Sequence, residues 1–165
     1  MNLGPAHHIV TPLIASPANS TNPPFYLKLD NLQPPGSYKI RGMSLKARRA
    51  IKERGAKRFV ASSGGNAGLA VAYTACRMKI PCRVFVPSTT PESARSLIES
   101  YGAVCVVEGD LYAEADACAR AEGEEEGTEY FSAYDDNELW EGHASIVEEI
   151  KEQVRASSRS KEAYL

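Results

Sequence analysis

The sequence predicts an α/β fold in which a twisted parallel sheet carries helices on both faces. Short apolar runs rich in β-branched residues alternate in strict turn with longer segments of helical periodicity. The connections between them are short, as in parallel sheets whose strands are joined by crossover helices. With 165 residues, of which 43% are hydrophobic, the chain is long enough to bury the core of one domain.

The N-terminal part contains the first expected elements. Residues 1–24 are rich in proline, asparagine and serine, so we expect an extended or irregular segment with one short apolar piece, IVTPLI. The run FYLKLD (25–30) alternates apolar and polar residues, as a strand does. Helical spacing over 43–54 ends at Gly55, the residue type that most often follows the end of a helix.

The middle of the chain continues the alternation. RFVASS (58–63) reads as a strand, and the small residues of 67–79 suit a helix packed closely on a sheet. We expect Thr90 as the N-cap and Pro91 as the first residue of a later helix. The other expected elements are strands at 82–87, 103–109 and 129–134 and helices at 111–126 and 144–154.

The last segment, RASSRSKEAYL (155–165), is polar and has no periodicity, although one more strand is due there. We therefore expect the fold to be interrupted at this end. Such an interruption would leave apolar surface uncovered on Ile146, Val147 and Ile150.

Composition excludes several classes of partner. A net charge of -2 and a pI of about 6.0 give no electrostatic case for nucleic acid or an anionic membrane surface. The start of the chain lacks the layout of a secretory signal, and we expect a cytoplasmic protein. No CxxC pair is present, so we expect reduced thiols and no metal site. The four cysteines are Cys76, Cys82, Cys105 and Cys118.

Two segments are expected at the edge where ligands bind to parallel sheets, beyond the carboxyl ends of the strands. GSYKIRG (36–42) follows the predicted strand 25–30, and SSGGNAG (62–68) follows the next one. Right-handed crossovers between parallel strands would bring both loops to one edge. We therefore expect Lys39 to face Ser63 and Asn66 across a crevice.

The second loop suits a carboxylate. Gly64 and Gly65 let the backbone approach a ligand, and their N–H groups would point outward at the start of a helix. Ser63 and Asn66 add side-chain donors. The alternative is a plain strand-to-helix turn, and composition alone leaves both interpretations open.

Lys39 stands near a helix start, where a cation is unfavourable against the helix dipole. Partial desolvation and the positive helix end favour the neutral amine, which imine chemistry requires. An ordinary surface lysine is the alternative. A dinucleotide-binding loop is disfavoured because SSGGNAG lacks the GxGxxG spacing, and Tyr134 and Trp140 are interpreted as packing or hinge residues.

Together with VPSTTPES and YDDNELWEGH, the two loops resemble those of fold-type-II pyridoxal-phosphate enzymes, most closely the serine/threonine dehydratases. The likeness runs from Thr11 to Ile150. It implies the N-terminal half of a tryptophan-synthase β-like fold. Residues 1–37 would belong to a large domain, 38–140 would form a small α/β domain, and 141–165 would begin the large domain again and end in the polar tail.

The resemblance implies a role for each matching residue. Lys39 would bind the aldehyde of pyridoxal 5′-phosphate as an imine and later remove the substrate Cα proton. The ring of Tyr38 would stack on the cofactor, and Asn66 would bond to its ring hydroxyl. The residues implied for the substrate carboxylate are Ser63, Gly64, Gly65, Asn66 and Ala67.

The implied reaction is α,β-elimination, which converts L-serine to pyruvate and ammonia and L-threonine to 2-oxobutanoate. Ala67 after Asn66, and Ile40-Arg41 after the lysine, place the chain nearest the mammalian-liver-type branch. Family members are much longer, and their second half supplies the phosphate loop and a monovalent-cation site. The alternative is therefore a truncated, inactive fragment that acts as an interaction or remnant domain. A homodimer is expected where a full-length form exists.

Overall fold

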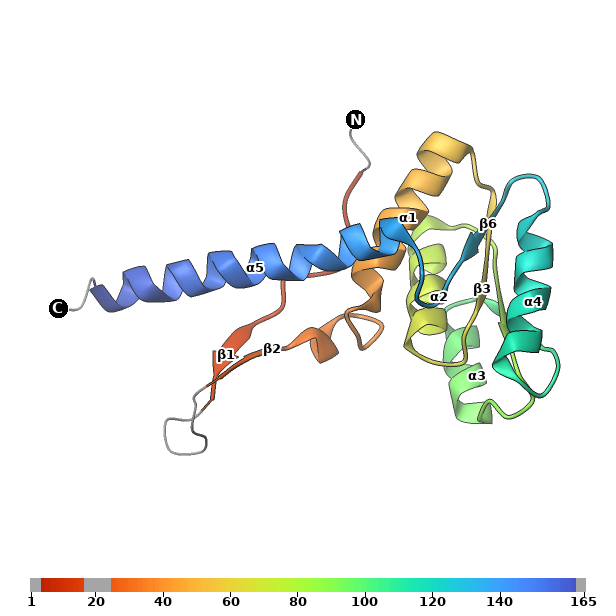
Figure 1. The fold of residues 1–165 in the computed structure, drawn as a ribbon, viewed down its shortest axis with the longest axis horizontal. Coiled ribbons are helices and arrows are strands. Elements are labelled where there is room, and N and C mark those ends of the chain that lie inside the picture. The colour runs from red at the N-terminus through yellow and green to blue at the C-terminus, as the bar shows by residue number, and fades with distance from the viewer. Residues whose placement is uncertain (1–3, 17–24, 163–165) are drawn as a thin grey trace.

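The computed structural model describes residues 4–16 and 25–162, with side chains as far as residue 157. A compact α/β unit occupies one end of the molecule (Figure 1). From it extends an arm, which we define as the two-stranded sheet of residues 13–15 and 26–28 together with the long C-terminal helix beside it. The active-site candidates lie in the compact unit.

The compact unit is built on a parallel sheet, which confirms the predicted fold class. Its four strands run in the order β5-β4-β3-β6, and every neighbouring pair is parallel. Val60 in the central strand is opposite Arg83 on one side and Tyr130 on the other. The strands are β3 (Arg58–Ser62), β4 (Cys82–Val86), β5 (Val104–Val107) and β6 (Thr128–Phe131).

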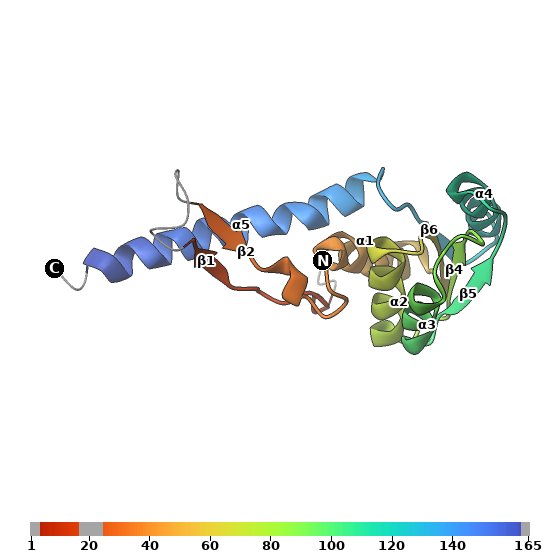
Figure 2. The same ribbon diagram turned by 90° about the horizontal axis from the view of Figure 1, so that it is seen from below.

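Helices cover both faces of this sheet (Figure 2). One face packs on α1, α2 and α3, and its core includes Phe59 and Phe131, whose rings meet edge to face with centroids 4.9 Å apart. The other face packs Val60 and Phe85 against alanines of α4. Strand residues alternate between the faces, because successive side chains point in opposite directions. The helices are α1 (Lys39–Arg54), α2 (Asn66–Met78), α3 (Glu92–Ser100) and α4 (Tyr112–Gly123).

Two predicted helix starts were wrong. Helix α1 begins at Lys39 rather than at residue 43. It does end at Gly55, as predicted, and the φ of 67° at this residue is the left-handed conformation that favours glycine. Helix α3 begins at Glu92 with Pro91 as its N-cap, so Pro91 is not helical and Thr90 is not the cap. The Thr90 side chain packs against the loop after β3 instead.

The strand predicted at 25–30 does not join the parallel sheet. Strand β2 (Tyr26–Lys28) pairs antiparallel with β1 (Leu13–Ala15), and Leu27 stands opposite Ile14. The partner strand thus begins within the apolar piece of the segment that we expected to be extended or irregular. Alternation of apolar and polar residues predicts a strand but does not identify its neighbour, which is a non-local choice.

Helix α5 (Asn137–Glu162) is much longer than the predicted 144–154, and the tail expected to be patternless is helical to residue 162. It begins early because the Asp136 carboxylate accepts hydrogen bonds from the N–H groups of Glu138 and Leu139. It continues because the tail contains no glycine or proline and several good helix formers.

The arm is fastened to the compact unit where α5 crosses α1. Gly42 and Gly142 permit this close crossing, since a Cβ on Gly142 would lie 2.6 Å from the Gly42 Cα. Next to the crossing, the fully buried Arg41 guanidinium bonds to both Asp30 and Glu149 at 2.7 Å. Although burial alone would lower it, these hydrogen bonds raise the pKa of Arg41 above its usual value. One side chain of α1 therefore bonds both to Asp30, which follows β2, and to Glu149 of α5.

Among the described helices, none is both long and apolar enough to cross a membrane. All four cysteines are free thiols. Cys82 is buried, and burial raises its pKa to about 12, so its thiol stays protonated.

Candidate active site

A cavity of about 420 Å³ opens at the carboxyl ends of the parallel strands. Lys39 lies on one side of it and the loop after β3 lies on the other, so the expected juxtaposition of the two loops is present. Such a volume is sufficient for a small organic ligand. The lining residues are Lys39, Ser63, Gly64, Gly65, Asn66, Ala67, Pro87, Thr90, Tyr112 and Tyr134.

The Lys39 amine has an unusual set of neighbours for a lysine of this chain. Its Nζ donates a hydrogen bond of 2.6 Å to the Ala133 carbonyl and lies 5.0 Å from the centre of the Tyr134 ring. Lys28 and Lys46, by contrast, pair with carboxylates at 2.7 and 2.5 Å. The side chain of Lys39 is half-buried and carries its amine into the cavity.

Lys39 reaches this place by a route that the sequence did not predict. It follows no strand of the parallel sheet. The chain passes from the short 3-10 helix η1 (Asp30–Leu32) through a turn at Gly36, whose φ is 80°, and enters α1. Buried Ile40 and Met43 then fix α1 against the sheet. The predicted position of Lys39 near a helix start is therefore correct. The strand that precedes it, however, is not part of the parallel sheet, as the prediction had assumed.

The loop after β3 leads directly into α2. Gly65 is the N-cap residue, and its N–H donates to the Ser63 hydroxyl at 3.2 Å. No side chain caps α2, so the amides of its first turn remain available to an anion. Gly65 and Asn66 are exposed at the cavity, while Ala67 lies beneath them. The Ser63 proton stays free to donate, because this hydroxyl acts as the acceptor for Gly65.

The glycines of this loop differ in the space around their Cα atoms. A Cβ on Gly64 would lie 2.5 Å from the Thr90 Cγ2, and a Cβ on Gly68 would lie 2.0 Å from the Ser63 carbonyl oxygen. Those two positions need glycine for internal packing. Gly65 faces open space, where the nearest atom to an added Cβ is 3.9 Å away. Only Gly65 therefore fits the expectation that backbone is bared for a ligand.

Tyr38 is beside the cavity but does not line it. Its ring is 45% exposed and packs edge-on against the His143 ring, with centroids 5.0 Å apart. His143 Nδ1 accepts a hydrogen bond from the Gly42 N–H at 3.2 Å. Burial, followed by the charges of Lys39 and Arg41, lowers the pKa of His143 to about 4. The imidazole is therefore neutral at physiological pH and keeps this acceptor.

The sequence analysis missed four residues of the cavity wall: Pro87, Thr90, Tyr112 and Tyr134. Tyr134 and Trp140 were interpreted as packing or hinge residues, and their 70% and 54% exposure disfavours a packing role. The missed signal was position. All four residues follow the carboxyl ends of β4, β5 and β6, which open onto the same edge as the loop after β3.

A partly buried carboxylate, that of Asp116, lies behind the wall. Asp116 accepts hydrogen bonds from the hydroxyls of Ser62 and Tyr130, each at 2.5 Å, and from Arg120 at 2.7 Å. Burial alone would raise the pKa of Asp116, but these bonds hold it below its usual value. Asp116 is therefore ionised and fixes the end of β3, where the loop begins.

The arrangement fits a negatively charged aldehyde cofactor such as pyridoxal phosphate. Lys39 offers an amine that is held by a carbonyl, not neutralised by an acid. The open backbone at Gly65 and the uncapped start of α2 lie across the cavity from that amine. No second glycine-rich loop follows residue 68 in the sequence to cup the phosphate. The described residues thus provide one side of such a site.

Comparison with known proteins gives consistent matches. Residues 5–160 match the family described as pyridoxal-phosphate dependent enzyme. An L-serine dehydratase/L-threonine deaminase of Mus musculus is 42% identical over 152 residues, which cover 90% of this chain and 46% of the mouse protein. An L-serine dehydratase of Saccharomyces cerevisiae is also 42% identical, with 93% and 49% covered.

Comparison with solved structures gives relatives of the same kind. A fungal L-serine ammonia-lyase from Rhizomucor miehei superposes with a TM-score of 0.82 at 33% identity, which covers 90% of this chain and 48% of the fungal chain. The chain therefore spans about half the length of the relatives that it matches.

Proposed function

Because the chain belongs to the pyridoxal-phosphate dependent enzyme family, we propose that its cavity carries the lysine-bearing half of an L-serine dehydratase site that also accepts L-threonine. One observation carries this proposal. The Lys39 amine, bonded to a carbonyl at 2.6 Å, faces the uncapped start of α2 across a cavity of about 420 Å³.

Three residues would hold the cofactor. Lys39 would bind it covalently through its amine, and the half-exposed ring of Tyr38, 5.5 Å from that amine, offers an aromatic face. Asn66, exposed at the start of α2, would bond to the ring hydroxyl. Pyridoxal phosphate supplies an electron sink for charge that develops at the substrate Cα.

The loop after β3 would hold the substrate carboxylate. The amides at the start of α2 and the free proton of the Ser63 hydroxyl are donors on one side of the cavity. Gly64, Gly65, Asn66 and Ala67 complete this wall. A carboxylate bound here would fix the amino acid with its Cα facing the Lys39 side of the cavity.

Lys39 would also transfer the proton. Its amine, once displaced by the substrate's amino group, is the base nearest to the expected Cα position. Loss of this proton and of the β-hydroxyl would remove water from L-serine and leave 2-aminoacrylate, which tautomerises and is hydrolysed by water to pyruvate and ammonia. Tyr112 and Tyr134 also line the cavity, and the Tyr134 ring lies beside the Lys39 amine.

The arm suggests how the site is completed. We infer that residues 38–140 form a small domain, and that 1–37 and 141–165 belong to a larger one. The separation of the arm from the parallel sheet supports this division (Figure 1). We also propose a cytoplasmic protein that acts on a small amino acid, binds neither nucleic acid nor membrane, and is a homodimer if a full-length form exists.

An inactive fragment that pairs with another protein is a second candidate. The apolar side chains of the arm favour it, since Ile14, Tyr26, Leu27 and Val147 are each at least 44% exposed. Under this alternative the Lys39 cavity would be a remnant without cofactor.

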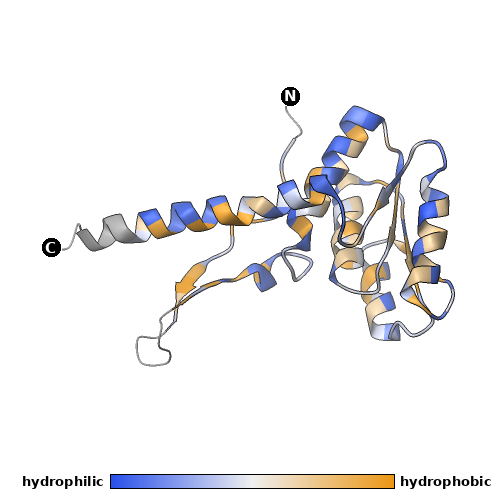
Figure 3. Cartoon of the chain, in the orientation of Figure 1, coloured by the Kyte–Doolittle hydropathy of each residue, from blue (hydrophilic) through white to orange (hydrophobic). Residues whose placement is uncertain are grey.

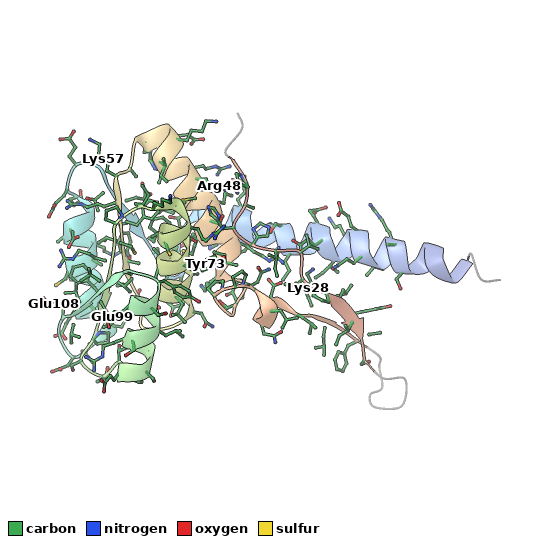
Figure 4. The ribbon with its side chains drawn as sticks, turned by 180° about the vertical axis from the view of Figure 1, so that it is seen from behind. Lys28, Arg48, Lys57, Tyr73, Glu99 and Glu108 are labelled. Carbon is green, nitrogen blue, oxygen red and sulfur yellow. The ribbon has the colours of Figure 1, made fainter. Side chains whose placement is uncertain are left out.

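Titration with pyridoxal phosphate separates the two candidates. We expect an imine absorbance band in the wild type that is absent in Lys39→Ala and kept in Lys57→Ala, because Lys57 lies before β3 at the other end of the strands (Figure 4). Release of pyruvate from L-serine would add the activity. A band that survives in Lys39→Ala would contradict the proposal, and no band in any variant would favour the inactive fragment.

A further inference from the structure

We propose that the Ala133 carbonyl and the Tyr134 ring form a holding site for the Lys39 amine, which the amine occupies whenever it is not bonded to the cofactor. This inference rests on the proposed function for its role in catalysis, although the holding site itself does not require it. It makes Tyr134 a positioning residue that acts through Lys39.

The contacts define the site closely. Lys39 Nζ donates to the Ala133 carbonyl at 2.6 Å and lies over two aromatic rings, 5.0 Å from the centre of Tyr134 and 5.5 Å from that of Tyr38. A carbonyl oxygen and aromatic faces attract an ammonium group without neutralising it. The amine is therefore held, but less firmly than it would be by a carboxylate.

The loop that presents these groups is fixed from both ends. The Ser132 hydroxyl accepts the N–H groups of Tyr134 and Asp135 at 3.3 and 3.1 Å. The Trp140 indole N–H then donates to the Tyr134 carbonyl at 3.0 Å. A tyrosine whose ring is 70% exposed thus has its backbone bonded through both its N–H and its carbonyl.

The same loop is tied to the helix that carries Lys39. Asp136 accepts a hydrogen bond of 2.5 Å from Lys46, which lies two turns beyond Lys39 on α1. Ala133 is itself buried, at 3% exposure. The lysine backbone and its holding site therefore belong to one rigid assembly, and only the lysine side chain needs to move between its two positions.

Packing does not explain this construction. The Tyr134 ring buries little surface. Its aromatic contact is with Tyr112, at a distance of 6.4 Å between ring centroids. A fixed but solvent-exposed ring above an amine is what a holding site requires. When the substrate's amino group takes the place of Lys39, a nearby resting position keeps the free amine within reach of the Cα proton.

Selective acetylation of the full chain tests the holding site without any cofactor. Limiting acetic anhydride is followed by peptide mass spectrometry of Lys39 in the wild type, Tyr134→Leu, Tyr134→Phe and Tyr26→Leu. Tyr26 is an exposed tyrosine of the arm and serves as the matched control. Circular dichroism verifies that each variant is folded.

We expect Tyr134→Leu to raise the Lys39 labelling rate by about two- to five-fold, as an exposed cation–π contact implies. Tyr134→Phe keeps the ring and should label at the wild-type rate, as should Tyr26→Leu. Ser132→Ala loosens the loop but leaves the ring in place, and it should give a smaller increase. An unchanged rate in both Tyr134→Leu and Ser132→Ala would overturn the proposal, as would equal rates in Tyr134→Phe and Tyr134→Leu.

The rate of imine formation with pyridoxal phosphate separates this inference from the proposed function. If Lys39 is released from its holding site, Tyr134→Leu should form the imine faster than the wild type and Tyr134→Phe should not. Absence of imine in every variant would contradict the proposed function but leave the labelling result standing. Equal imine rates in all variants, with equal labelling, would contradict the holding site alone.

Discussion

The apolar residues of the compact unit are buried, whereas many of those in the arm are exposed. In the parallel sheet, Phe59, Val60 and Phe131 are at most 1% exposed, whereas Ile14, Tyr26 and Leu27 of the arm are between 44% and 55% exposed. Figure 3 shows hydrophobic residues along β1 and along α5 of the arm. The compact unit thus holds its own core and the candidate site, while the arm has an apolar surface that is suited to a partner.

Polar contacts hold the arm where apolar burial does not. Lys28, the last residue of β2, pairs with Glu149 of α5 at 2.7 Å (Figure 4). Glu149 and Asp30 in turn share the buried Arg41. Since Arg41 is two residues beyond Lys39, the junction that orients the arm also fixes the start of the helix that carries the reactive amine.

The largest expected effect tests the contrast in burial directly. Phe59→Ala removes a ring that is 1% exposed and should lower the free energy of unfolding by about 3–5 kcal/mol. Leu27→Ala, in the arm, should change it by less than about 0.5 kcal/mol. Urea denaturation measures both. Similar losses in the two variants would show that the arm is covered in solution.

Arg41→Met tests the junction. It leaves the buried Asp30 carboxylate without a cation, although Glu149 keeps Lys28, and we expect a loss of about 3 kcal/mol in urea denaturation. Arg49→Met is the matched control, because Arg49 pairs with Glu141 at the surface and should cost less than about 1 kcal/mol. A junction variant no less stable than the control would disprove a structural role for Arg41.

A smaller effect should appear with pH. The pKa of His143 is about 4 in the folded chain and near 6.5 when unfolded, so the unfolded chain binds the extra proton between these values. Stability should therefore fall as the pH falls from 6.5 to about 4, by about 1 kcal/mol after solvent screening. His143→Gln should have a flatter profile over this window. Parallel profiles would show that His143 does not contribute to it.

The smallest effect on stability should come from the apolar surface itself. Val147→Lys places a charge on an exposed site of α5 and should change the free energy of unfolding by less than about 0.5 kcal/mol. It should nevertheless reduce the binding of a hydrophobic dye, measured by fluorescence. The same substitution at Leu97, an exposed residue of α3 outside the arm, should leave dye binding nearly unchanged. An equal loss of dye binding in both variants would mean that the dye does not bind preferentially to the arm.

The sequence predicted what depends on local pattern. Alternating strands and helices identified the parallel sheet, and the glycine-rich loop and Lys39 were expected at one edge. The partner of strand β2 was not predictable, because pairing depends on residues distant in the chain. The length of α5 was missed because helix propensity without apolar periodicity gives a weak signal.

The cavity wall shows the same limit. Tyr134 was interpreted as a packing or hinge residue, because no sequence motif indicates that its ring lies 5.0 Å from the Lys39 amine. The contact between Gly64 and Thr90 joins two loops that are far apart in sequence, so the reason for glycine at that position became visible only in three dimensions. Residue types were readable from the sequence, but their neighbours were not.

Reductive trapping of pyridoxal phosphate tests the central claim most directly. The full chain is incubated with a low concentration of the cofactor and reduced with borohydride, and the modified lysines are mapped by mass spectrometry. The account predicts that Lys39 carries the adduct well before exposed lysines such as Lys57 and Lys79 do. Adducts spread evenly over the surface lysines, with Lys39 unmodified, would contradict it.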